Sequence, residues 1–386
     1  MISPAERMSV VKPYVFAKMN KRKDELKAGG MDIIALDMGS PDLPPNEPIV
    51  DTLITAARNA NKHGYGGFTG SAAFRKSFTQ YYARRFAVDL HPEKEALPLL
   101  GSKEGIYHTA FAYLNPGDYA LVPDPGYPTY TSGTEIAGAT PYFMPLLKAN
   151  NWLPDLKAIP ADVLAKTKLM WLNYPNNPTG AVAPLSFFEQ VVGFCKRHNI
   201  LLCHDNPYCE NGYDGYVAPS VLQIPGAKDI AIEFFSLSKS HNMAGMRVGA
   251  ILGNADAIKM IGMLKTNVDS GPYIGIQDAT VAALTGDQEW LYERQETYKT
   301  RRDLVVQGLR AAGCEVEVPQ ATIYVWARIP AEYKTAADWA EYLLEKKGVS
   351  LTPGTAFGAQ GEGYVRISLG TATNRIKEAV ERIATK

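Results

Sequence analysis

The chain has few cysteines, no excess of either charge and no long apolar run, and each absence excludes a class of protein. Its four cysteines form neither a CxxC pair nor a dense framework, which indicates reduced thiols and a cytoplasmic protein. The 40 basic residues equal the 40 acidic residues in number and form no basic stripe, so we expect no nucleic acid and no membrane as partner. No segment approaches a membrane span, the first residues lack the apolar core of a signal peptide, and we predict no metal site.

A lysine between hydroxyl side chains follows a short apolar run, residues 230–235, that is typical of a strand. Lysine becomes a good nucleophile only where its pKa is lowered, and a Schiff base with a cofactor aldehyde would achieve this for Lys239. Ser236, Ser238 and Arg247 would suit a phosphate dianion, because arginine binds two oxygen atoms at once. The alternative is a solvated loop with an unrelated lysine and arginine, and the rest of the chain decides between these interpretations.

Apolar strand-like runs alternate with helical segments over the first two thirds of the chain. At 386 residues, 46% apolar and 21% charged, the chain is long enough for two domains. The alternation predicts an α/β fold with a largely parallel sheet and right-handed crossovers. The expected strands are 97–101, 119–122, 167–172, 200–204 and 230–235, and the expected helices include 102–113 and 184–199.

Polar residues follow three of these strands directly. Asn177, Asp205 and Lys239 each come after a predicted strand, about one strand–helix–strand unit apart. Ligands collect at the carboxyl ends of the strands in such sheets. We therefore expect these three side chains to converge on one crevice.

Other candidates lie in turns and at a helix start, and each has a second interpretation. Gly39 follows a short strand, where it serves either a turn or the close approach of a ligand to the backbone. Ser102 and Lys103 open a helix whose free N–H groups could bind an anion. Tyr127 is either a packed turn residue or a surface for a stacked ring. Tyr65, in a glycine-rich stretch, belongs either to a flexible loop or to an arm that reaches a neighbouring subunit.

The last third of the chain differs in composition and predicts a second, α+β domain. Alternation in the strand 364–369 places Arg366 on the non-apolar face, where it is either solvated or binds a substrate carboxylate. We expect a large domain over 45–280 and a small domain formed by 1–44 with 281–386. The elements of the small domain are helices 12–30, 288–312, 336–347 and 372–384 and strands 321–328, 350–352 and 364–369.

Three motifs carry a family resemblance that runs from about residue 12 to the C-terminus. They are Asn-Asn-Pro-Thr-Gly at 176–180, Asp-x-Pro-Tyr at 205–208 and Ser-Leu-Ser-Lys at 236–239, followed by Arg247. With them the chain resembles the class I/II aminotransferases, pyridoxal phosphate enzymes of fold type I. The resemblance implies a mostly parallel sheet flanked by helices, a smaller α+β domain, and amino-group transfer between an L-amino acid and a 2-oxo acid by a ping-pong mechanism.

The resemblance also implies a role for each residue that binds the cofactor ring. Lys239 would form the Schiff base with the cofactor and then move the substrate proton. Asp205 would pair with the pyridine nitrogen and keep it protonated. Asn177 and Tyr208 would hydrogen-bond the phenolic oxygen, and Tyr127 would stack on the ring.

The phosphate and the substrate have their own implied partners. The backbone of Ser102 and Lys103 and the side chains of Ser236 and Arg247 would hold the phosphate. Tyr65 would reach it from the partner subunit, which predicts a homodimer. The substrate carboxylate would be bound by a further set, Arg366, Asn177 and the backbone of Gly39.

Within the family the chain looks most like the LL-diaminopimelate aminotransferase subgroup, with Gly-Ser-Lys-Glu-Gly-Ile at 101–106 among the shared motifs. His241 and Met246 depart from the residues usual there, an aromatic and a tryptophan. Because both lie near Lys239 in the sequence, we expect them to alter the rim of the pocket. Aspartate, alanine or aromatic aminotransferases and a cysteine-S-conjugate β-lyase are the alternatives on the same fold. A cofactor-sensing regulator is disfavoured, since the chain offers no DNA-binding helix.

Overall fold

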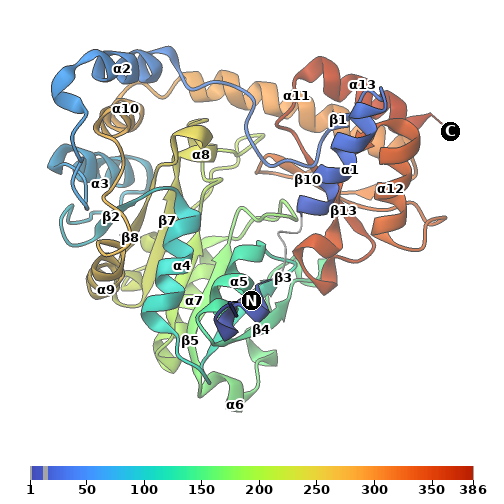
Figure 1. Cartoon of the computed structure of the whole chain (residues 1–386). Coiled ribbons are helices and arrows are strands. Elements are labelled where there is room, and N and C mark those ends of the chain that lie inside the picture. Colours follow the sequence, from blue (N-terminus) through green and yellow to red (C-terminus); the bar gives the residue numbers. More distant parts are fainter. Residues whose placement is uncertain (1, 12–15, 386) are drawn as a thin grey trace.

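A seven-stranded sheet lies at the centre of the fold (Figure 1). The structure is a computed structural model that describes residues 2–11 and 16–385. The five strands from β7 to β4 are parallel, and β8 runs antiparallel between β2 and β7, which confirms the predicted, largely parallel sheet. In spatial order the strands are β2 (Ala96–Leu99), β8 (Gly249–Gly253), β7 (Ala231–Ser236), β6 (Leu201–Asp205), β5 (Thr167–Asn173), β3 (Tyr119–Asp124) and β4 (Thr140–Pro145).

Helices cover both faces of this sheet, so its central strands are apolar on both sides. Leu169 and Trp171 of β5 pack in one apolar cluster with α4 and α9, whereas Met170 and Leu172 pack in another with α3, α7 and α10. This explains why the strands read as continuous apolar runs. The helices of this part are α2 (Glu47–Arg58), α3 (Ala72–Phe86), α4 (Ser102–Tyr113), α5 (Pro128–Ile136), α6 (Ala161–Leu164), α7 (Leu185–His198), α8 (Leu237–Ser240), α9 (Ala255–Lys265) and α10 (Ile274–Thr285).

A second, antiparallel sheet forms with the C-terminal third of the chain, at the right of Figure 1. Its order is β12 (Thr352–Pro353), β13 (Tyr364–Ser368), β10 (Tyr324–Arg328) and β9 (Glu315–Val316), and a parallel pair joins β1 (Ile34–Ala35) to β11 (Val349–Ser350). The helices are α1 (Phe16–Ala28), α11 (Trp290–Ala311), α12 (Ala336–Lys347) and α13 (Thr373–Ala384). Although α1 and α12 are far apart in the sequence, they lie close together: Arg22 Nε of α1 donates a hydrogen bond to Glu345 Oε1 of α12 at 2.6 Å.

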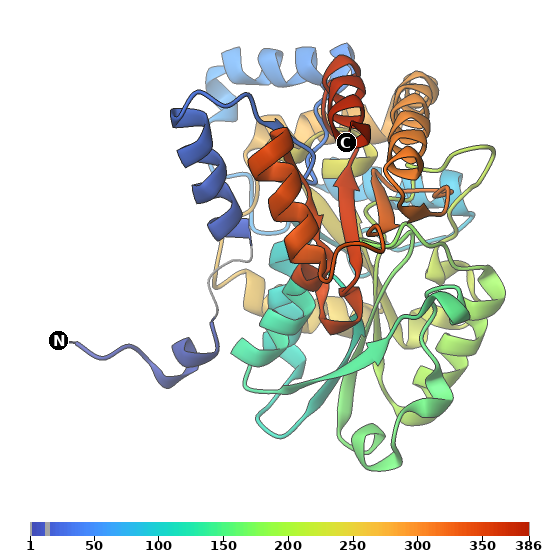
Figure 2. The same cartoon turned by 90° about the vertical axis from the view of Figure 1, so that its right-hand side faces the viewer.

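Short 3-10 helices complete the connections. The N-terminal segment with η1 lies against α5 and leads outward to the N-terminus on the left of Figure 2. Within the described ranges, no helix has both the length and the apolar character needed to cross a membrane. The 3-10 helices are η1 (Glu6–Val10), η2 (Ala60–Lys62), η3 (Lys148–Asn150), η4 (Leu156–Ala158), η5 (Val221–Gln223), η6 (Ala227–Asp229), η7 (Ala244–Met246), η8 (Gly354–Phe357) and η9 (Ala359–Gly361).

The predicted element bounds are confirmed in most places and corrected in a few. Helices 102–113 and 336–347 are confirmed at both ends. The predicted strand 321–328 begins only at Tyr324, because Thr322 has a left-handed φ of 77° that interrupts extended backbone. Of the predicted helix 12–30 the structure gives Phe16–Ala28, and residues 12–15 lie outside the described residues.

Candidate active site

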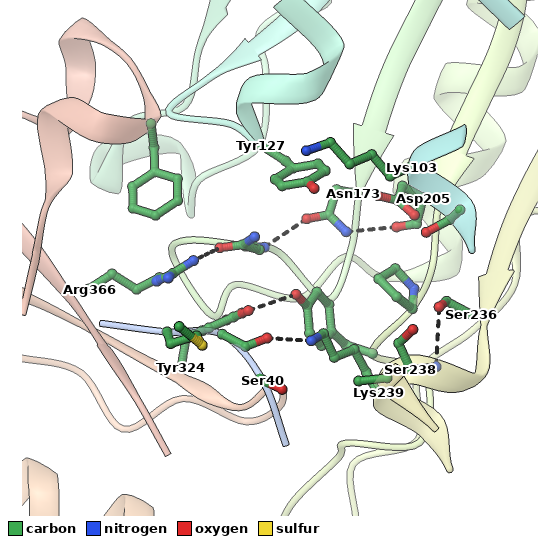
Figure 3. A pocket seen from close by; sticks show the side chains of 18 of the residues that line it. Ser40, Lys103, Tyr127, Asn173, Asp205, Ser236, Ser238, Lys239, Tyr324 and Arg366 are labelled. Atoms are coloured by element: carbon green, nitrogen blue, oxygen red, sulfur yellow. Dashed lines mark hydrogen bonds between the residues drawn. The ribbon is translucent and has the colours of Figure 1, made fainter. Parts of the chain in front are cut away.

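A cavity of about 340 Å³ opens at the carboxyl ends of the central strands, where residues of the second sheet also reach it (Figure 3). All the predicted site residues but Tyr65 line this cavity. The predicted convergence of Asn177, Asp205 and Lys239 at the strand ends is therefore confirmed. The predicted residues found there are Gly39, Ser102, Lys103, Tyr127, Asn177, Asp205, Tyr208, Ser236, Lys239, Arg247 and Arg366.

Tyr65 is the exception. Its side chain is 90% exposed and is not part of the cavity wall that the described residues form. The predicted contact requires a second subunit, so its role stays a prediction.

Lys239 lies in α8, the short helix that directly follows β7. Ser236 caps this helix by accepting a hydrogen bond from the Ser238 amide at 3.2 Å. The Lys239 ammonium donates to the carbonyl of Gly39. Burial, and then the guanidinium groups of Arg366 and Arg247, lowers the pKa of the Lys239 amine to about 7. A large share of this amine is therefore unprotonated and nucleophilic near neutral pH.

Asp205 is the last residue of β6, and only one of its two carboxylate oxygens has a hydrogen-bond partner among the described residues. Its Oδ2 accepts a hydrogen bond from the Tyr130 hydroxyl at 2.6 Å. Its Oδ1 is buried and has no hydrogen-bond partner among residues 2–11 and 16–385. Burial raises the pKa of this carboxyl to about 6, while the Tyr130 hydrogen bond acts in the opposite direction. A buried carboxylate oxygen of this kind calls for a cationic N–H donor.

Arg366 points into the cavity from β13 and is only 3% exposed, so the solvated alternative is wrong. It donates to Asn177 Oδ1 at 2.9 Å and to the Asp37 carbonyl at 2.8 Å. Its guanidinium lies 4.2 Å from the ring centroid of Tyr324 and 4.6 Å from that of Phe357. A rigid, buried arginine at this place suits a carboxylate.

A chain of hydrogen bonds links Arg366 to Asp205 across the cavity floor (Figure 3). Asn177 Oδ1 accepts from Arg366, and the backbone N–H of Asn177 donates to Asn173 Oδ1 at 2.7 Å. Asn173 in turn donates to the Asp205 carbonyl at 2.7 Å. The two charged ends of the site are therefore held at a fixed separation.

A glycine is required at position 39 because the side chain of Tyr324 approaches its backbone closely. A Cβ atom at this position would lie 2.1 Å from the Tyr324 hydroxyl. The Tyr208 hydroxyl donates to the same Tyr324 oxygen at 3.1 Å. Gly39 thus lets the N-terminal segment pack against the ring that supports Arg366.

The opposite end of the cavity has the features of an anion site. Ser102 begins α4, and the preceding Gly101 has φ = 88° and no room for a Cβ, which would lie 2.3 Å from the Arg247 guanidinium. Arg247 Nη1 lies 3.4 Å from Ser238 Oγ. Burial, and then Arg247, lowers the pKa of the Lys103 amine. Two cations beside a helix N-terminus form a site for a phosphate dianion.

His241 and Met246 do not alter the rim, and that prediction is wrong. Neither residue lines the cavity in the part of the chain that the structure describes. His241 is fully buried behind α8 between the rings of Tyr81 and Trp290, where burial lowers its pKa to about 3. Met246 packs against the main apolar core. His241 follows Lys239 by two residues, at the end of α8, so its side chain leaves the helix in a different direction from the lysine.

Several residues in or beside the site were not predicted, among them Asn173 and Tyr324 in the cavity wall and Tyr130 behind Asp205. Asn173 was available to the strand-end argument, because it is the last residue of β5. Tyr130 lies one helical turn beyond Tyr127, which gave a weak signal. Tyr324 lies in a predicted strand, and only the packing of the two sheets shows its position.

These parts fit pyridoxal phosphate. The available oxygen of Asp205 matches a protonated pyridine nitrogen, the α4 terminus with Arg247 matches the phosphate, and Lys239 matches the aldehyde. A mostly parallel sheet with this lysine and this aspartate at its strand ends defines a fold type I pyridoxal phosphate enzyme.

Comparison with known proteins narrows the class to one family. The sequence model of the family "aminotransferase class I and II" matches residues 31–383, and the chain belongs to this family. The protein is a pyridoxal-phosphate-dependent aminotransferase.

Three of the similar proteins match this chain along nearly its whole length. LL-diaminopimelate aminotransferase of Moorella thermoacetica is 49% identical over 379 residues, 98% of this chain and 97% of its own. A substrate-bound BacF structure from Bacillus subtilis has a TM-score of 0.96 at 39% identity, covering 100% of this chain and 98% of its own. An aspartate aminotransferase of Thermus thermophilus has a TM-score of 0.92 at 28% identity, covering 100% and 99%.

Proposed function

We propose that this aminotransferase uses LL-diaminopimelate as its amino donor and a 2-oxo acid as its acceptor, in two half-reactions. The observation that carries the proposal is the identity of 45 to 49% to LL-diaminopimelate aminotransferases over nearly the full chain. The similarity in fold alone does not choose a substrate, since an aspartate aminotransferase matches with a TM-score of 0.92. The cysteine-conjugate lyase and the aspartate, alanine and aromatic aminotransferases are the outcomes that the test below separates.

In this proposal the residues of the chain divide the chemistry. The bound cofactor supplies an electron sink for the bond that breaks at the substrate α-carbon. Arg366 binds and orients the substrate carboxylate, with Asn177 holding the guanidinium in place. Nζ of Lys239, partly unprotonated near neutral pH, takes and returns the proton of the α-carbon. Asp205 keeps the ring nitrogen protonated.

The remaining predicted residues hold the cofactor in its place. We assign the phosphate to the backbone of Ser102 and Lys103 and to the side chains of Ser236 and Arg247. A ring that stacks on Tyr127 would direct its phenolic oxygen to Tyr208 and Asn177. The support for these roles is that all of these residues line one cavity.

We also propose a cytoplasmic homodimer in which Tyr65 completes the phosphate site of the partner. The support is the exposure of Tyr65, 90%, and of Phe68, 52%, in the same glycine-rich loop. The division into a domain of 45–280 and a domain of 1–44 with 281–386 stays a proposal as well. It is supported by the separation of the seven-stranded sheet from the four-stranded sheet and by the apolar clusters that pack against each of them.

The test is the visible absorbance of the holoenzyme after single amino acids are added without any oxo acid. We expect LL-diaminopimelate to bleach the band of the bound cofactor faster than aspartate, alanine or phenylalanine at equal concentration. Lys239→Ala is the control in which this bleaching is lost. Preferred bleaching by another amino acid would contradict the substrate, and pyruvate and ammonia released from a cysteine conjugate under a persistent band would indicate the lyase.

A further inference from the structure

Tyr130 contacts Asp205 from outside the cavity. It lies on α5, is 1% exposed, and is not among the described residues that line the cavity. Its hydroxyl donates to Asp205 Oδ2 at 2.6 Å, and the other oxygen of this carboxylate is the one left available. Tyr130 thus binds Oδ2 of Asp205 and leaves Oδ1 available to a ligand in the cavity.

The position of this hydroxyl is fixed by the core. The Tyr130 ring stacks on Trp171 with a centroid distance of 5.1 Å and an interplanar angle of 11°. It also meets the Tyr127 ring in an edge-to-face contact, with a centroid distance of 5.7 Å and an interplanar angle of 81°. Trp171 is fully buried in β5, the strand next to the one that carries Asp205. A buried ring that packs against two other rings has little freedom to move its hydroxyl away from the carboxylate.

We propose that Tyr130 is a positioning residue, which orients Asp205 so that Oδ1 meets the protonated ring nitrogen of pyridoxal phosphate and which favours the ionised carboxylate. This inference rests on the role proposed for Asp205 above. The bond is charge-assisted, and it restricts rotation of the carboxylate because the second oxygen is bound at a short distance.

Other charged groups around Asp205 act in opposite directions. His204, its neighbour in β6, lowers the pKa of the carboxyl, and Glu233 of β7 raises it, while burial has the largest effect and raises the pKa to about 6. Lys239 lines the cavity from α8, and Tyr208 from the loop after β6. Burial raises the pKa of the Tyr130 phenol well above 10, so this hydroxyl remains a donor throughout the working range.

Loss of the Tyr130 hydroxyl would change the charge of Asp205. Without the Tyr130 hydroxyl the pKa of Asp205 rises further above its usual value, so a larger fraction of the carboxyl is protonated at pH 6 to 7. A neutral carboxyl attracts a pyridinium nitrogen less than a carboxylate does. Loss of the hydroxyl therefore weakens cofactor binding, and weakens it more at pH 6 than at pH 8.5.

The experiment titrates the apoprotein with pyridoxal phosphate and measures the dissociation constant at both pH values. We expect Tyr130→Phe to raise it about tenfold or more at pH 6, in line with the loss of a hydrogen bond to a charged group, and less at pH 8.5. Tyr174→Phe is the matched control, because Tyr174 is an equally buried tyrosine whose hydroxyl donates to the Trp152 carbonyl at 2.6 Å, away from the cavity. This control should leave the constant unchanged.

A cofactor analogue separates positioning from packing. With 1-deazapyridoxal phosphate, which lacks the ring nitrogen, wild type and Tyr130→Phe should bind equally. Tyr130→His, which restores an N–H donor, should recover part of the affinity for pyridoxal phosphate, and it is the second variant if Tyr130→Phe folds poorly.

The outcomes distinguish this inference from the function on which it rests. Equal dissociation constants for wild type and Tyr130→Phe at pH 6, or an equal loss with the deaza analogue, would overturn the positioning role. Asp205→Ala, measured in parallel, tests the role of Asp205: if it binds pyridoxal phosphate as tightly as wild type, the site assignment itself fails.

Discussion

At the scale of single residues, the cavity holds a lysine where a cation is unfavourable. Lys239 is surrounded by protein and shares its space with the guanidinium groups of Arg247 and Arg366, and the pKa of its amine falls to about 7. An amine with a lowered pKa is useful in a nucleophile, but it costs stability in the apoprotein. The unfolded chain binds a proton at Lys239 up to about pH 10.5, whereas the folded chain releases it near pH 7.

This difference predicts that Lys239→Met stabilises the apoprotein. Below pH 7 the folded state carries the unfavourable charge, and between pH 7 and 10.5 the unfolded state binds more protons, so the wild type gains stability as pH rises. We expect the variant to have the higher free energy of unfolding at pH 7 and the advantage to shrink at pH 9.5, measured by urea unfolding. Lys334→Met, on an exposed loop, is the control. An advantage that is constant with pH would contradict the argument.

At the scale of elements, the turn from β2 to α4 joins backbone conformation to anion binding. Gly101 has φ = 88°, which L residues with side chains avoid, and the space where its Cβ would lie is filled by the Arg247 guanidinium. The same turn directs the first N–H groups of α4 toward the cavity. Its glycine therefore serves both the turn and the position of the arginine.

We predict that Gly101→Ala raises the dissociation constant for pyridoxal phosphate at least tenfold. The new Cβ would displace the guanidinium, and the strain of the positive φ adds about 1 kcal/mol of destabilisation. Gly117→Ala is the matched control: its φ is 93°, and no atom lies within 4 Å of the added Cβ. It should lose similar stability and keep its affinity for the cofactor. Equal affinity losses in the two variants would mean that strain alone is responsible.

At the scale of the whole molecule, the proposed dimer shares each active site between two chains. Coexpressing Lys239→Ala with Tyr65→Ala tests this sharing. If Tyr65 acts across the interface, the mixed dimer combines both defects in one site and leaves the other site intact, so we expect activity well above that of either parent. Purification with two different affinity tags isolates the mixed dimer. Activity no higher than that of the parents would place Tyr65 outside the partner's site.

The sequence was sufficient for those features that depend on pattern and on motifs. Strand-end residues such as Asn177, Asp205 and Lys239 could be placed together because parallel strands bring their carboxyl ends to one edge. Arg366 was placed on the correct face by alternation, but its burial could not be predicted, since that depends on how the second sheet packs over the first.

Contacts between distant segments were beyond reach from the sequence. Tyr130 meets Asp205 across 75 positions, and Tyr324 of β10 meets Gly39 in the loop after β1. The reversed direction of β8 and the inward turn of His241 likewise follow from packing and leave no local pattern.

The approach of Gly39 to Tyr324 limits how this enzyme can change by mutation. A side chain at position 39 has no room while the tyrosine hydroxyl lies 2.1 Å from its place. A smaller residue at position 324 would leave Tyr208 without its acceptor and Arg366 without one of its two flanking rings. Each single step is thus unfavourable, and only a paired change opens the route. Natural drift and directed evolution of the carboxylate end should therefore alter these two positions together.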